Sequence, residues 1–111
     1  MGDWRTEEAT TQTVVRELNE WTEEERDIRS PDGRALDSFL CECGAAGCAD
    51  LIQLTRAEYE TVRSFATRFA VRLDHENPEV DYIVDENDRF ATVQKLSGRP
   101  ERIAQASDPR R

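Results

Sequence analysis

The chain has 111 residues, of which 35% are charged and 7% aromatic, and a formal net charge of −9, which is typical of one small acidic domain with a thin core. The acidic balance and the scarcity of lysine disfavour binding to nucleic acid, which needs clustered positive charge. No apolar stretch is long enough to cross a membrane and no apolar signal segment opens the sequence, so we expect a cytoplasmic protein with no membrane partner.

Residues 1–30 form the first predicted unit, an acidic amphipathic helix. Val14, Leu18 and Trp21 recur in it at helical spacing, and glutamates fill much of the remaining surface. Such a stripe either docks on its own domain or pairs with another helix, in a partner protein or in a second copy. We expect docking on its own core, because one tryptophan and a few aliphatic side chains suit a small core. Aromatic side chains anchor interfaces when exposed, so Trp4 and Trp21 are the candidate partner-binding residues.

A turn is predicted at residues 30–33, where proline, aspartate and glycine follow one another. Beyond it, residues 36–98 form the second predicted unit, an α+β domain. Its first two strands are indicated over residues 38–43 and 51–54. A helix is predicted to begin after Thr55, because Thr55 and Glu58 have the spacing of a capping box.

The rest of the predicted domain is a small antiparallel sheet. Alternating apolar residues indicate a strand over residues 68–73, and residues 80–84 and 90–96 have the pattern of a hairpin. Residues 99–111 are expected to be a basic tail that contains one or two helical turns and has a loose end.

All three cysteines lie within eight residues, in the order Cys41, Cys43 and Cys48. An odd, clustered number of cysteines argues against a disulfide framework in a cytoplasmic chain. The alternation of a strand places Cys41 and Cys43 on one face, and the two glycines before Cys48 let the chain turn back toward them. Three thiolates suit Zn²⁺, and His75, the only histidine, is the candidate fourth ligand of a tetrahedral Cys₃His site.

Bound zinc would also stabilise a domain whose core is thin. Three alternatives remain open for the cysteines: inert free thiols, a labile disulfide between Cys43 and Cys48, and a catalytic thiolate. No nucleophile–base pair is visible in the sequence, so no catalytic residue is predicted.

Several segments carry distinctive patterns: Phe39-Leu-Cys-Glu-Cys-Gly followed by Cys48, Ile52-Gln-Leu-Thr, Glu58-Tyr-Glu-Thr-Val-Arg, Arg68-Phe and His75-Glu-Asn-Pro-Glu-Val. Together with Arg16-Glu-Leu-Asn-Glu upstream, they resemble a small actinobacterial family of hypothetical proteins with the pattern FxCECxxxxC, IxLTxxEYExVR and RFxVxPGHExPEV. The resemblance covers about residues 14–96. It supports treating the three cysteines and His75 as one site, and it implies neither an activity nor a partner.

The chain departs from that pattern at three places. Leu73-Asp74 replaces a Pro-Gly pair before the histidine, Ala66 replaces a proline, and Gln94 replaces a glutamate. The first departure bears on how tightly the chain turns before His75.

The sequence therefore predicts a zinc-stabilised α+β module that is not an enzyme and that binds a protein partner, with self-association through the N-terminal helix as one form of that binding. The main alternative is a redox- or zinc-responsive regulator that uses the cysteines as a switch. A zinc-dependent hydrolase and a nucleic-acid-binding module are less favoured, and no small-molecule substrate is indicated.

Overall fold

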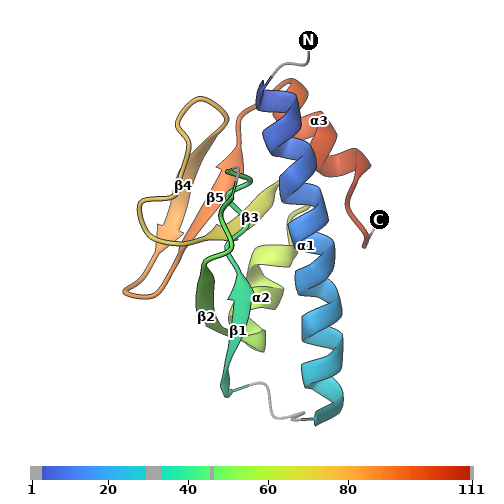
Figure 1. Ribbon diagram of the computed structural model, residues 1–111, viewed down its shortest axis with the longest axis vertical. Helices are drawn as coiled ribbons and strands as arrows, with labels where there is room; N and C mark the ends of the chain where they lie inside the picture. Colours follow the sequence, from blue (N-terminus) through green and yellow to red (C-terminus); the bar gives the residue numbers. More distant parts are fainter. Residues whose placement is uncertain (1–3, 30–33, 46, 111) are drawn as a thin grey trace.

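The computed structural model describes the backbone of residues 4–29, 34–45 and 47–110, and the side chains of residues 11–25, 34–45 and 47–110 (Figure 1). The turn predicted at residues 30–33 and the side chain of Trp4 lie outside these described residues. Among the described residues, no helix combines the length and the apolar character that crossing a membrane would require.

The described chain is an α+β domain, which confirms the predicted fold class. Its strands form two small antiparallel sheets, one of two strands (β1-β2) and one of three (β3-β5-β4), where the sequence suggested one. In chain order, the elements are α1 (Trp4–Arg29), β1 (Leu36–Leu40), β2 (Leu51–Thr55), α2 (Arg56–Arg63), β3 (Arg68–Val71), β4 (Asp81–Glu86), β5 (Ala91–Lys95) and α3 (Arg99–Ala106).

The capping box predicted at the start of α2 is confirmed. The Thr55 hydroxyl accepts a hydrogen bond from the Glu58 backbone N–H at 3.1 Å, and the Glu58 carboxylate accepts one from the Thr55 backbone N–H at 2.9 Å. Both free N–H groups are satisfied locally, which is why the helix begins here. The Glu58 carboxylate also pairs with Arg89, and this ion pair attaches the loop of the β4–β5 hairpin to α2.

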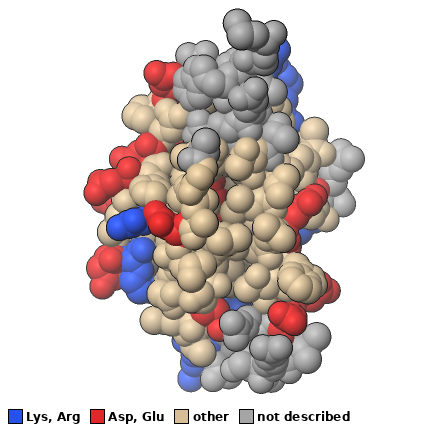
Figure 2. All heavy atoms as spheres, in the orientation of Figure 1, with Lys and Arg blue, Asp and Glu red and all other residues tan. Residues whose placement is uncertain are grey.

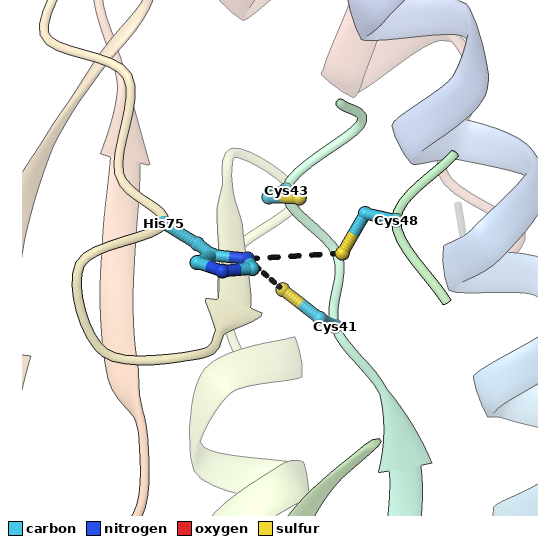
Figure 3. Close-up of side chains that lie close together, drawn as sticks. All are labelled: Cys41, Cys43, Cys48 and His75. Atoms are coloured by element: carbon cyan, nitrogen blue, oxygen red, sulfur yellow. Dashed lines mark hydrogen bonds between the residues drawn. The ribbon is translucent and has the colours of Figure 1, made fainter. Parts of the chain in front are cut away.

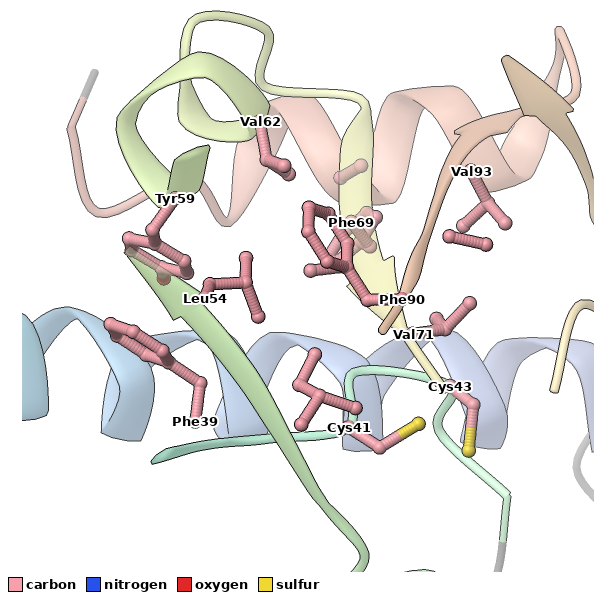
Figure 4. Close-up of a cluster of buried hydrophobic side chains, with 14 residues drawn as sticks. Phe39, Cys41, Cys43, Leu54, Tyr59, Val62, Phe69, Val71, Phe90 and Val93 are labelled. Atoms are coloured by element: carbon pink, nitrogen blue, oxygen red, sulfur yellow. The ribbon is translucent and has the colours of Figure 1, made fainter. Parts of the chain in front are cut away.

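The core lies between the two sheets and α2 (Figure 4). Phe39 of β1 stacks on Tyr59 of α2, with ring centroids 4.6 Å apart. Phe69 and Val71 of β3 continue the apolar layer across the three-stranded sheet. The thiols of Cys41 and Cys43 lie at the end of this layer, so the cysteine segment belongs to the core (Figure 4).

Helix α1 packs on the domain through the face opposite to the predicted one. Val14, Leu18 and Trp21 are 53%, 47% and 62% exposed, whereas Gln12 and Arg16 are fully buried. The prediction that the apolar stripe docks on the chain's own core is therefore wrong. Burying polar side chains is unfavourable unless they are hydrogen-bonded, so their partners explain this orientation.

Those partners are backbone groups left free where other elements end. The Asn19 amide donates to the Leu40 carbonyl and accepts from the Leu40 N–H, both at 2.9 Å. These two hydrogen bonds are like those that a residue of a neighbouring β-strand would form with Leu40. The Gln12 amide donates to the Glu42 carbonyl at 2.9 Å. The Arg16 guanidinium donates to the carbonyls of Ala66 and Ala104, at 2.6 and 2.9 Å.

The C-terminal segment is part of the same packing. Helix α3 lies beside α1 near its N-terminal end, and the chain then runs along α1 (Figure 1). Asp108 is buried and forms an ion pair with the guanidinium of Arg63 on α2. The end expected to be loose is thus held as far as Arg110, which forms ion pairs with glutamates of α1 and α2.

Candidate metal centre

Three thiols and one imidazole converge at one point beside the core (Figure 3). Their ligand atoms all lie within 4.8 Å of one another, and the residues are Cys41, Cys43, Cys48 and His75, hereafter the Cys₃His cluster. The His75 Nδ1 atom lies 3.5 Å from the Cys41 Sγ and 3.7 Å from the Cys48 Sγ. The four residues predicted as ligands are therefore brought together in a geometry compatible with a bound metal ion.

Cys41 and Cys43 lie just beyond β1, which ends at Leu40. The prediction of a strand as far as residue 43 is wrong in this detail, because the chain leaves β2 and passes to the other sheet. The Cys41 N–H still donates to the Asp50 carbonyl at 2.8 Å, whereas the next N–H, of Glu42, donates to the Ala70 carbonyl of β3 at 2.9 Å. The cysteine segment therefore bridges the two sheets.

Two glycines bring Cys48 back toward the first two cysteines, as the sequence predicted. Gly44 and Gly47 have φ angles of 75° and 79°, in the left-handed region that a side chain disfavours. The Cys48 N–H donates to the Ala45 carbonyl at 3.1 Å, which closes a short turn.

Glu42 points away from the cluster and anchors the segment between the two cysteines. It is fully buried, and its carboxylate accepts hydrogen bonds from the Asn19 amide at 2.8 Å and from the Ala70 N–H at 2.9 Å. Burial raises the pKa of this carboxyl group. Because Glu42 is occupied in holding α1 and β3, the structure gives it a positioning role.

His75 reaches the thiols through a tight turn after β3. Asp74 has a φ angle of 68°, and the His75 N–H donates to the Arg72 carbonyl at 3.0 Å. Aspartate tolerates the left-handed conformation better than most residues. The turn thus forms although Leu73-Asp74 stands where the family pattern has Pro-Gly.

Further groups surround the ligands and orient them. The backbone N–H of Arg72 donates to the Cys41 Sγ at 3.1 Å, and that of Ala45 donates to the Cys43 Sγ at 3.5 Å. On the far side of the imidazole ring, the His75 Nε2 lies 3.6 Å from the Asp50 carboxylate, which also binds Arg72 at 2.9 Å. With its Nε2 turned toward a carboxylate, His75 presents Nδ1 to the sulfurs.

The thiols influence one another's protonation. A hydrogen bond from Cys41 lowers the pKa of the Cys43 thiol to about 5. The same hydrogen bond, together with burial, raises the pKa of Cys41, and burial raises that of Cys48. One thiol of the cluster is thus poised to be a thiolate, the form that binds metal ions.

Comparison of the chain with protein-family models, with curated proteins and with solved structures finds no match in any of the three. The family resemblance drawn from the motifs stays a prediction. What defines this protein is a small α+β domain with a Cys₃His cluster at the junction of its two sheets.

Trp21, which the sequence predicts as a partner-binding residue, lies on the exposed face of α1 and lines a pocket with residues of α2 and the C-terminal segment.

The sequence patterns did not predict the residues that support the cluster, Asp50 and Glu42. A carboxylate two residues after Cys48 was a visible signal for the first, since a carboxylate commonly orients a ligating histidine.

Replacing Asp50 with asparagine should weaken metal binding without removing a ligand. We expect about 10-fold lower affinity of Asp50→Asn, because loss of a carboxylate that orients a ligating histidine typically has an effect of 10–100-fold. Competition with a chromophoric chelator measures it. Asp88→Asn, which changes an exposed carboxylate in the β4–β5 loop, is the matched control. Equal affinities for the two variants would contradict the role given to Asp50.

Proposed function

We propose that this protein is a non-enzymatic interaction module whose fold is held together by a structural zinc ion bound by the Cys₃His cluster. The observation that carries the proposal is the convergence of all four ligand atoms within 4.8 Å. These ligands come from two places, the segment between the sheets and the turn after β3, so one ion would connect parts of the chain 27 to 34 residues apart.

Two separations within the cluster match those of a zinc site. With Zn–S bonds of about 2.3 Å and a Zn–N bond of about 2.0 Å, tetrahedral geometry places sulfur and nitrogen about 3.5 Å from each other. The two sulfur–nitrogen distances of 3.5 and 3.7 Å agree with this value. A set of three thiolates and one imidazole is also among the common sets for structural zinc, and four protein ligands leave no position for a substrate.

Burial supports a structural role over a redox switch. A redox-sensing cysteine needs a low pKa together with exposure to solvent. Among the three cysteines, the thiol with the lowered pKa, Cys43, is buried, and the more accessible Cys48 has a raised pKa. The regulator alternative therefore has less support than the structural one.

One observation favours a second candidate, a zinc-dependent hydrolase. A pocket of about 370 Å³ adjoins the cluster and is lined in part by Cys43, His75 and Glu76. One carboxylate oxygen of Glu76 is buried with no hydrogen-bond partner. If one cysteine left the metal, a water molecule could take its place beside this carboxylate, as in catalytic zinc sites.

Elemental analysis of the purified protein tests the proposal. We expect one zinc ion per chain, and loss of most of that zinc in Cys48→Ser, because one of its four ligands is replaced. Ser97→Ala, which changes an exposed residue, should keep its zinc. A folded wild-type chain without stoichiometric metal, purified in the absence of chelators, would refute the structural zinc.

Cobalt substitution separates the two candidates. A closed Cys₃His site should give the intense visible absorption of tetrahedral Co²⁺, unchanged when cyanide is added. A spectrum that shifts with cyanide would reveal an open position and favour the hydrolase.

A further inference from the structure

The docking of α1 through polar side chains leaves its apolar stripe facing outward. Val14, Leu18 and Trp21 follow one another along the helix at intervals of about one turn, and each is about half exposed or more. The outer face of α1 is thus an ordered row of large apolar side chains, and the part of the chain that the structure describes places none of its own elements over it. Exposed apolar rows of this kind mark interaction sites.

A pocket of about 570 Å³ lies at the Trp21 end of this row. Five glutamates and two arginines contribute to its lining, and the glutamates are Glu17, Glu20, Glu23, Glu24 and Glu60. In Figure 2, separate patches of acidic side chains are visible on the lower right of the molecule, on the side where α1 runs, and others lie on the left beside basic side chains.

The chain's own C-terminal segment places a guanidinium in this pocket. Arg110 donates to Glu20 through Nε and to Glu60 through Nη1, both at 2.6 Å, and to Glu23 through Nη2 at 3.1 Å. Arg110 reaches these groups from the C-terminal segment beyond α3, and its side chain stays about one third exposed. Because Arg110 occupies this pocket, the pocket can accommodate the side chain of an arginine.

The pocket stays acidic with Arg110 in it. Burial and the adjacent Glu60 raise the pKa of Glu23 to about 8, so this carboxyl group is largely protonated near neutral pH, but the other four glutamates of the pocket still outnumber its two arginines. One oxygen of Glu23 is buried and has no hydrogen-bond partner. A further cation beside Trp21 would find the carboxylates of Glu17 and Glu24 and an aromatic face.

We propose that the outer face of α1, from Val14 to Trp21, together with the acidic pocket, binds a basic amphipathic segment of another protein, and that Arg110 competes for the same pocket. In such a segment, apolar side chains would cover Val14 and Leu18, and an arginine would enter the pocket in place of Arg110. This inference rests on the proposed function as an interaction module and names the chemistry of its partner.

Charge argues against a second copy of this chain as the occupant. Pairing two copies along this face would bring Glu17, Glu24 and their equivalents together, and like charges in close contact are unfavourable. A basic segment would be attracted by the same glutamates, and its association rate would be higher at low salt than at high salt.

A synthetic peptide serves as the probe. The peptide has 16 residues, carries a fluorescent label and has a high helix propensity. Its leucines stand at positions i, i+3, i+4 and i+7, and arginines lie on both sides of this apolar face. Binding to the 111-residue chain, loaded with zinc, is followed by fluorescence anisotropy. Two control peptides carry glutamate in place of every arginine, or serine in place of every leucine.

We expect saturable binding of the basic amphipathic peptide only, weakened at high salt. Leu18→Ser and Trp21→Ser should each reduce the affinity about 10-fold or more, as hot-spot residues do. Tyr82→Ser, which removes a similarly exposed aromatic residue from β4, should leave it unchanged. Arg110→Gln should bind the peptide about 3- to 10-fold more tightly, because the internal competitor is gone; about 1.4 kcal/mol corresponds to ten-fold.

Three results would overturn the proposal: no saturable binding, equal binding of the glutamate peptide, or concentration-dependent dimers in sedimentation that Trp21→Ser abolishes. Unchanged affinity in Arg110→Gln would overturn the role of the pocket. Zinc content is measured on the same samples, which separates this proposal from the proposed function. Zinc-loaded protein that does not bind the peptide would refute the binding surface but not the structural zinc. Folded, metal-free protein that binds the peptide would refute the structural zinc but not the binding surface.

Discussion

Removal of the proposed zinc ion by a chelator is expected to abolish the cooperative thermal unfolding of this domain. Cys41 and Cys43 belong to the buried core, and the cluster joins the segment between the sheets to the turn after β3. Structural zinc contributes on the order of 10–16 kcal/mol in small peptides, and natural domains are stable by only about 5–15 kcal/mol. Without the ion, the net free energy of unfolding should therefore fall close to zero.

Circular dichroism and calorimetry measure this effect. Equimolar Zn²⁺ should restore the transition, whereas Mg²⁺, which prefers oxygen ligands, should not. Treatment with chelator already saturated with zinc is the control for direct effects of the chelator. An unchanged melting temperature after complete removal of metal would mean that the thiols pack as ordinary small apolar groups.

The second large effect is expected at Arg16. Replacement by alanine should lower the free energy of unfolding by about 3 kcal/mol, because the carbonyls of Ala66 and Ala104 lose charged donors in a buried site. The guanidinium also stacks over the Phe69 ring, 4.5 Å from its centroid, and this contact disappears with it.

Urea denaturation of Arg16→Ala, with Arg102→Ala as its control, measures the difference. Arg102 is an exposed arginine of α3, so its replacement should change stability by no more than about 0.5 kcal/mol. Arg16→Lys should rescue little, because one ammonium group lacks the planar fork that reaches two carbonyls. Equal stability of Arg16→Ala and Arg102→Ala would show that α1 is held by other contacts.

Local signals in the sequence were enough for much of the fold. The capping box at Thr55 and the hairpin of β4 and β5 depend on residues close together in the chain, and both form as predicted. The Cys₃His cluster was also predictable, because three of its residues lie within one short segment and the chain contains a single histidine.

The end of β1 and the side chains that support the cluster were harder to predict from the sequence. β1 stops before the cysteines because the chain exchanges its partner, from Asp50 beside β2 to Ala70 of β3. Such an exchange depends on where another sheet lies in space. The same holds for Glu42, whose role depends on Asn19 and on a backbone group of β3.

The orientation of α1 was decided by tertiary structure alone. Hydrophobic periodicity correctly predicts a helix around Val14 and Leu18, and by itself it favours burying that stripe. The opposite face is buried instead because Gln12, Arg16 and Asn19 satisfy backbone groups at the ends of other elements, 21 to 88 residues away. Sequence thus determined that a helix forms and that it has an apolar side. Only the complete fold, with its free carbonyls and N–H groups in place, determined which side meets the solvent.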